Sequence, residues 1–96
     1  MGDVETKREG SQRMAGLALY GYPQCPYCQR VLRAVESLDL VIELRNTMLE
    51  SEYHEQLLAA LGRGTVPVLR IEDEPGDVKW LPESADIVRY LEARFG

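Results

Sequence analysis

The chain contains 96 residues, of which 45% are hydrophobic and 28% are charged, and its formal net charge is −5. A chain of this length builds one domain around one core, and its apolar share is too high for a disordered protein. The negative charge gives no electrostatic basis for binding nucleic acid or an anionic membrane. No apolar run approaches the roughly 18 residues that a membrane-spanning helix needs, and the N-terminus carries no hydrophobic segment of the secretory type. We therefore expect a cytoplasmic protein whose cysteines are kept reduced.

Residues 1–14 are mostly polar and charged. They hold too few apolar side chains to offset the entropy that is lost on ordering. We expect these residues to form a disordered N-terminal tail, and residues 15–96 to form the folded domain.

The folded domain is predicted to begin with a strand that leads into a helix. Residues 17–20 form an apolar run without helical period, which predicts a buried strand, and a turn follows at 21–24. From 26 to 38 the apolar side chains recur at helical spacing, and Pro26 suits the first position of that helix. Cys25 is therefore expected to cap the helix N-terminus.

The remaining elements alternate in the same way. Strands are predicted over residues 41–44, 66–71 and 78–81, a helix over 49–61, and a last helix that begins with Ser84 as its cap. The polar turn at 72–77 joins the last two strands as a hairpin. The order β-α-β-α-β-β-α predicts an α/β sandwich with a four-stranded mixed sheet and three helices.

The most informative motif is Cys25-Pro26-Tyr27-Cys28, at the junction of the first strand and the first helix. Unpaired N–H groups and the helix dipole at a helix N-terminus stabilise a thiolate, so we expect Cys25 to be the nucleophile. Cys28 lies one helical turn further in, where it can attack a mixed disulfide on Cys25. The motif therefore predicts an oxidoreductase with a redox-active disulfide between the two cysteines.

Two other interpretations of the cysteine pair are a zinc half-site and two unrelated core residues. Zinc needs four ligands, and the single histidine, His54, is isolated on the second predicted helix. Core cysteines are not usually introduced by a turn and separated by a proline. Redox chemistry is the interpretation that we favour, and no metal is expected.

In motif, order and separation, Leu19-Tyr20, Cys25-Pro26-Tyr27-Cys28 and Thr65-Val66-Pro67 resemble the glutaredoxin family, and the resemblance covers about Leu17 to Gly96. It implies a thioredoxin-like fold and a glutathione-dependent oxidoreductase in which Cys25 attacks and Cys28 resolves. The implied partners are glutathione and disulfide-bearing or glutathionylated proteins. The protein would act as a monomer in electron transport and cell redox homeostasis.

The resemblance also implies where glutathione binds. Pro67 would be a cis-proline facing the cysteines, and the backbone of Val66 would pair with the cysteinyl part of glutathione. Tyr27 would flank the groove, and Arg63 matches a position where glutaredoxins often carry an arginine for the glycyl carboxylate. The implied binding residues are Tyr27, Arg63, Thr65, Val66, Pro67, Glu83, Ser84 and Asp86.

The sequence departs from the glutaredoxin pattern in two places. In the segment 81–87, Glu83-Ser84 replaces the usual Gly-Gly stretch and is similar to the Glu-Ser signature of the glutathione transferase N-terminal domain. Both families hold the γ-glutamyl end of glutathione there: Ser84 and free N–H groups suit its carboxylate, and Glu83 or Asp86 its ammonium. An ordinary capped helix would explain Ser84 equally well. Tyr22 stands where many glutaredoxins have a lysine, which leaves the helix terminus to stabilise the thiolate with less help.

Three alternative functions rank below the glutaredoxin interpretation. A dimer could bind an iron–sulfur cluster through Cys25 and two glutathiones, although the proline after the first cysteine disfavours this in the family. A glutathione transferase-like domain is suggested by Glu83-Ser84. A thioredoxin would carry Trp-Cys-Gly-Pro-Cys, which is absent from this chain.

Overall fold

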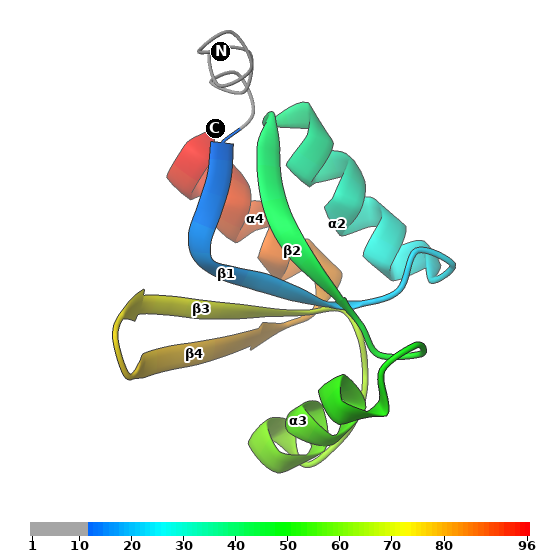
Figure 1. Cartoon of the computed structure of the whole chain (residues 1–96). Helices are drawn as coiled ribbons and strands as arrows, with labels where there is room; N and C mark the ends of the chain where they lie inside the picture. The colour runs from blue at the N-terminus through cyan, green and yellow to red at the C-terminus, as the bar shows by residue number, and fades with distance from the viewer. Residues whose placement is uncertain (1–11) are drawn as a thin grey trace, which may run out of the picture.

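The computed structural model describes residues 12–96, with side chains from residue 16 onward. A mixed sheet forms the middle layer, with α2 and α4 on one face and α3 on the other (Figure 1). The elements in chain order are β1 (Gln12–Gly21), α2 (Pro26–Ser37), β2 (Leu40–Asn46), α3 (Ser51–Leu61), β3 (Val68–Glu74), β4 (Asp77–Pro82) and α4 (Ser84–Phe95). The predicted α/β sandwich of the thioredoxin-like type, with order β-α-β-α-β-β-α, is confirmed.

The four strands lie in the order β2-β1-β3-β4. The first two strands are parallel and are joined by α2, as a parallel pair requires a crossover connection. β3 pairs antiparallel with both β1 and β4, and β3 and β4 form the predicted hairpin. The carboxyl end of β1 therefore reaches the start of α2 in the middle of the sheet, which is where the two cysteines lie.

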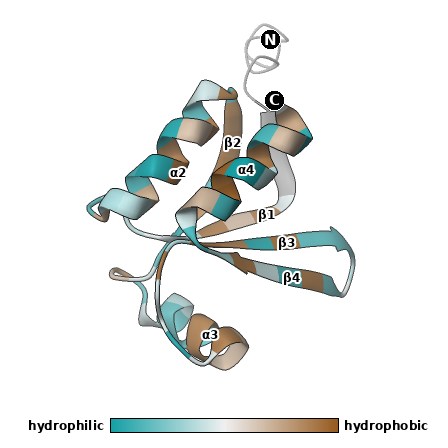
Figure 2. Cartoon of the chain, turned by 180° about the vertical axis from the view of Figure 1, so that it is seen from behind, coloured by the Kyte–Doolittle hydropathy of each residue, from teal (hydrophilic) through white to brown (hydrophobic). Residues whose placement is uncertain are grey.

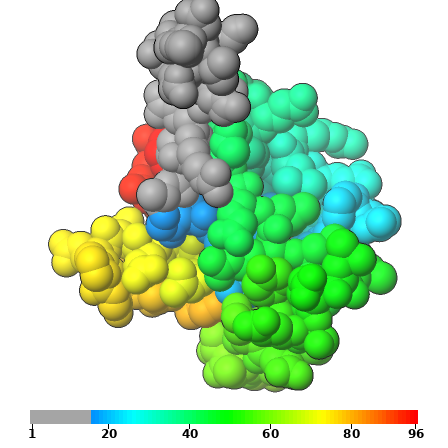
Figure 3. All heavy atoms as spheres, viewed as in Figure 1, coloured from blue at the N-terminus to red at the C-terminus, as the bar shows by residue number. Residues whose placement is uncertain are grey.

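The alternation of side chains along β1 divides the apolar core in two. Leu17 and Leu19 face α2 and α4, whereas Ala18 and Tyr20 face α3, because successive strand residues point to opposite faces. Figure 2 shows α2 and α4 side by side across the first face. In Figure 3, which is seen from the opposite side, the green surface of α3 lies below the strands, and the yellow surface of the β3–β4 hairpin projects to the left.

All four strands differ from their predicted bounds, β1 and β3 by the most. β1 begins at Gln12 rather than at 17, so residues 12–14 of the predicted tail are in the strand, and residues 1–11 lie outside the described part. The early start follows from backbone pairing with β2, in which Gln12 lies opposite Leu40. β3 begins at Val68 rather than at 66. Proline has no N–H to donate to a sheet ladder, so Pro67 stays outside the strand.

A buried hydrogen-bond group holds α3 against the sheet. The Tyr20 side chain is fully buried, and its hydroxyl donates to Gln56 Oε1 on α3 and accepts from Arg45 Nη1 at 2.7 Å. The same guanidinium lies over the rings of Tyr20 and Tyr53, 5.4 and 5.8 Å from their centroids. This group links β1, β2 and α3.

We expect Tyr20→Phe to lower the free energy of unfolding by about 1–3 kcal/mol, because it leaves Arg45 and Gln56 without their buried partner. Urea denaturation followed by circular dichroism measures the loss. Tyr22→Phe is the matched control, since the Tyr22 hydroxyl has no hydrogen-bond partner within residues 12–96, and it should change stability by less than about 0.5 kcal/mol. Equal stability of the two variants would contradict the role given to the Tyr20 hydroxyl.

Candidate functional site

The first cysteine of the motif lies where the sequence predicts it, at the N-terminus of α2. Cys25 is the N-cap residue, with extended backbone angles, and Pro26 occupies the first helical position. The Cys25 N–H donates to the Tyr22 carbonyl at 3.2 Å, and the Cys25 carbonyl accepts from Gln29 N at 2.9 Å. These bonds fix the turn before the helix, so the half-buried Cys25 side chain is held at the end of α2.

The second cysteine differs from the first in its surroundings. The Cys28 side chain is fully buried, and both cysteines are free thiols. Burial and a hydrogen bond with the Cys25 thiol raise the pKa of Cys28 from 9.0 to about 11. Cys28 is therefore a neutral thiol over the physiological pH range, in contact with the more accessible Cys25. The two cysteines thus differ in access, and their roles as attacking and resolving thiol stay a prediction.

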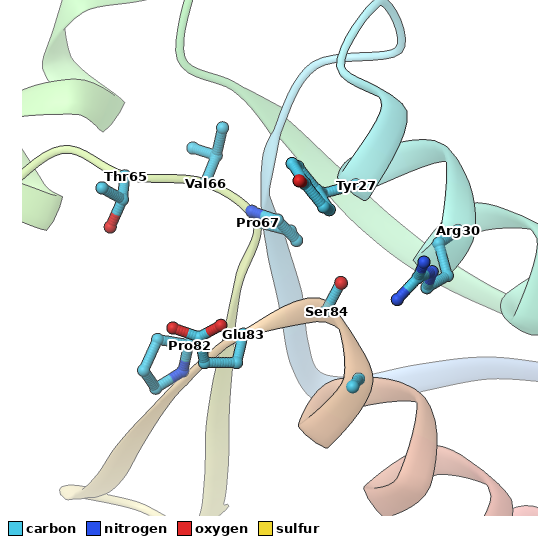
Figure 4. Close-up of a pocket in the computed structure, with 9 residues that line it drawn as sticks. Tyr27, Arg30, Thr65, Val66, Pro67, Pro82, Glu83 and Ser84 are labelled. Atoms are coloured by element: carbon cyan, nitrogen blue, oxygen red, sulfur yellow. The ribbon is translucent and has the colours of Figure 1, made fainter.

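A cavity of about 380 Å³ opens beside the N-terminus of α2 (Figure 4). It lies between the start of α2, the loop before β3 and the junction of β4 with α4. The residues that line it are Tyr27, Arg30, Thr65, Val66, Pro67, Pro82, Glu83, Ser84 and Ala85. Six of the eight predicted binding residues are thus brought together from three distant parts of the chain. The Val66–Pro67 peptide bond is cis, as the resemblance implies.

Two predicted binding residues do not line the cavity. Arg63 is exposed in the loop after α3. Asp86 lies within the first turn of α4 and forms an ion pair with Arg89, which is three residues further along the same helix. Cys25 does not line the cavity either, although Tyr27, two residues further along the chain, does.

Arg30 lines the cavity but was missed by the sequence analysis. It lies three residues after Tyr27 on α2, so the two side chains share a face of the helix. This spacing was the available signal, but it becomes informative only when Tyr27 is known to face a cavity.

The junction of β4 and α4 has an unusual backbone. Glu83, rather than the predicted Ser84, is the N-cap of α4, and it has φ 75° and ψ 115°. Positive φ is costly for a residue with a side chain, so the fold constrains this turn. The Glu83 side chain makes no capping hydrogen bond, and Ser84 becomes the first helical residue. The Ser84 hydroxyl points into the cavity (Figure 4).

Within residues 12–96 no group of three or more His, Cys, Asp and Glu side chains is arranged to hold a metal ion. Of the helices that the structure describes, none has the length and hydrophobicity needed to cross a bilayer.

Comparison with known proteins relates the chain to glutathione transferases and to a glutaredoxin. The sequence matches the family described as glutathione S-transferase, N-terminal domain, over residues 19–96. It is 30% identical over 76 residues to glutaredoxin 2 of Escherichia coli (strain K12). The aligned region covers 79% of this chain and 33% of that protein.

Two solved structures have a similar fold. A glutathione transferase homologue from Drosophila mojavensis, with bound glutathione, gives a TM-score of 0.70 at 25% identity over 86% of this chain and 36% of that one. The second is maleylacetoacetate isomerase from Anaeromyxobacter dehalogenans 2CP-1, with bound dicarboxyethyl glutathione and citrate in the active site. Its TM-score is 0.63 at 33% identity, over 82% of this chain and 36% of that one. The chain spans about a third of the length of these relatives.

Proposed function

Because the chain belongs to the glutathione S-transferase N-terminal domain family, we propose that it is a glutathione-dependent thiol–disulfide oxidoreductase that works through Cys25. The observation that carries this proposal is the arrangement of the two thiols. Cys25 is half-buried at the N-cap of α2 and is in contact with the fully buried Cys28. Tyr27, in the first turn of the same helix, lines the cavity.

The reaction starts when the Cys25 thiolate attacks the glutathionyl sulfur of a mixed disulfide. A new disulfide forms between Cys25 and glutathione, the original S–S bond breaks, and its electron pair leaves with the substrate sulfur, which takes a proton from water. The thiolate of a second glutathione then attacks the glutathionyl sulfur on Cys25. This step releases oxidised glutathione and regenerates the Cys25 thiolate, so two glutathionyl sulfurs end in one disulfide and the substrate is reduced.

Protein disulfides take a second route that uses Cys28. Cys25 first forms a mixed disulfide with the substrate, and Cys28 then attacks Cys25 to close the Cys25–Cys28 disulfide. Because the pKa of Cys28 is about 11, its thiol must lose the proton as it attacks. Two glutathiones afterwards reduce this disulfide and are themselves oxidised to one molecule of glutathione disulfide.

The cavity has groups suited to glutathione along its length. The loop at Val66 offers backbone hydrogen bonds to a peptide-like ligand, and Tyr27 covers one wall. Ser84 and Glu83 lie where a γ-glutamyl end would be held, with Ser84 for its carboxylate and Glu83 for its ammonium. Arg63 remains a candidate contact for the glycyl carboxylate outside the cavity, and Asp86 is already paired with Arg89.

The proposal is tested by glutathione-dependent reduction of a small mixed disulfide, coupled to glutathione reductase. Turnover that saturates with glutathione is the expected result. No turnover above the uncatalysed exchange would overturn the oxidoreductase proposal.

Glutathione transfer to an electrophile is a second candidate, because the matching family and the similar structures include glutathione transferases. Conjugation of glutathione to 1-chloro-2,4-dinitrobenzene distinguishes the two. A transferase would conjugate this compound without reducing mixed disulfides, and an oxidoreductase would do the reverse.

We expect Glu83→Gly to separate ligand binding from stability. Glycine adopts φ 75° without strain, so the free energy of unfolding should stay the same or rise by up to about 1 kcal/mol. The KM for glutathione should rise several-fold, because the carboxylate proposed for the ligand's ammonium is lost.

Steady-state kinetics and urea denaturation of the same preparation measure both effects. Asp39→Gly is the control, since Asp39 is the other non-glycine residue with positive φ within residues 12–96 and lies beyond the end of α2. Its KM should equal that of the wild type. An unchanged KM in Glu83→Gly would show that Glu83 does not hold the ammonium.

A further inference from the structure

The cavity contains a cation that no step of the proposed reaction uses. The guanidinium of Arg30 extends from α2 toward the start of α4 (Figure 4). Within the described part of the chain, Arg30 forms no ion pair or hydrogen bond. Its charge is therefore available to a ligand, and a planar guanidinium matches the geometry of a carboxylate.

A second polar group points into the same side of the cavity. Ser84 is only 7% exposed, and its hydroxyl has no hydrogen-bond partner among residues 12–96. The Ser84 hydroxyl is not among the buried polar atoms without a partner in residues 12–96, because it opens onto the cavity. It can therefore donate a hydrogen bond to a ligand oxygen bound there. In Figure 4 the Ser84 hydroxyl and the Arg30 guanidinium lie on the same side of the cavity.

The charges on the cavity wall are of both signs. Glu83 contributes a carboxylate and Arg30 a guanidinium, and the two do not pair with each other. The ligand that complements such a wall carries an ammonium and a carboxylate close together, as the free α-amino acid end of a γ-glutamyl peptide does. A plain thiol or a neutral peptide leaves both charges unpaired.

We propose that Arg30, together with Ser84, binds the α-carboxylate of the γ-glutamyl end of glutathione and is a specificity-determining residue of this site. This inference rests on the proposed function. It gives the cavity a selectivity for γ-glutamyl thiols that retain the α-carboxylate. Arg30 takes no part in the exchange between sulfur atoms. Its loss should therefore weaken the binding of glutathione and leave kcat unchanged.

The test compares two thiols in Arg30→Gln and in the wild type. Glutathione is the first, and 4-aminobutyryl-cysteinylglycine, which keeps the ammonium and lacks only the α-carboxylate, is the second. We expect Arg30→Gln to raise the KM for glutathione roughly tenfold or more, as for a lost charge-assisted hydrogen bond, with kcat unchanged. The KM for the decarboxylated thiol, already raised in the wild type, should not change further.

Two further variants control for general effects of charge. Arg33→Gln removes an exposed arginine one turn further along α2 that does not line the cavity, and its KM for glutathione should equal that of the wild type. Arg30→Lys keeps the charge but loses the planar fork, and it should give an intermediate KM. An equal rise of the KM for both thiols in Arg30→Gln, or no rise for either, would overturn the assignment of the carboxylate to Arg30.

Calorimetry with S-methylglutathione separates this inference from the oxidoreductase proposal, because that ligand binds without any thiol chemistry. Weaker binding to Arg30→Gln than to the wild type and to Arg33→Gln supports the Arg30 assignment even when turnover of mixed disulfides is absent. Failure of the wild type to bind S-methylglutathione would overturn the assignment.

Discussion

Replacement of Cys25 by serine should reduce activity to the uncatalysed rate with every disulfide substrate, because no other thiol in the chain is accessible. Cys28 is fully buried, and its pKa of about 11 keeps it protonated at neutral pH. Cys28→Ser leaves the glutathionylated Cys25 intermediate intact. Since a second glutathione resolves that intermediate, reduction of glutathione mixed disulfides should persist in Cys28→Ser while reduction of protein disulfides is lost.

The coupled assay with both kinds of substrate measures this difference, and mass spectrometry of the trapped intermediate identifies the attacked cysteine. Glutathione should be found on Cys25 in the Cys28→Ser variant. As an independent measurement, iodoacetamide at pH 7 should alkylate Cys25 in the folded wild-type protein and leave Cys28 unmodified until denaturant is added. Equal loss of activity in the two variants with mixed disulfides would contradict the assigned roles.

Gly21→Ala should be the most damaging single change at the site that leaves both thiols in place. Gly21 ends β1, and a Cβ on it would lie 2.5 Å from Cys28 Sγ, which is closer than real Cβ atoms approach their neighbours. The sulfur or the strand must move, and overpacking of this kind costs about 1–3 kcal/mol of the free energy of unfolding. Movement of Cys28 should also slow closure of the disulfide with Cys25.

The matched control removes the sulfur atom that the added Cβ would meet. In a Cys28→Ala background the nearest atoms to the added Cβ are Cys28 Cβ at 3.6 Å and Val66 Cβ at 3.8 Å, which are ordinary contacts. Gly21→Ala should then be nearly neutral, so urea denaturation of the four proteins in the cycle should give a coupling energy of about 1 kcal/mol or more. Additive effects would show that Gly21 does not make room for Cys28.

The sequence by itself determined the order of the elements and the position of the two thiols. Hydrophobic pattern is a local property, so the apolar run at 17–20 and the helical spacing after Pro26 were sufficient to predict that a strand leads into a helix here, although not the early start of the strand. The placement of Cys25 at the N-cap of α2 follows from the same local signals, because Pro26 suits the first helical position. Six of the implied binding residues line one cavity, and their binding role stays a prediction.

Only the tertiary structure decided which charges reach the ligand. Arg63 and Arg30 look alike as exposed arginines in the sequence, but α2 turns Arg30 into the cavity and the loop after α3 leaves Arg63 outside it. The left-handed backbone of Glu83 is likewise set by the junction of β4 with α4, and not by a local preference of glutamate. Which side chains share a cavity depends on the packing of segments up to about sixty residues apart along the chain. Local periodicity carries no information about that packing.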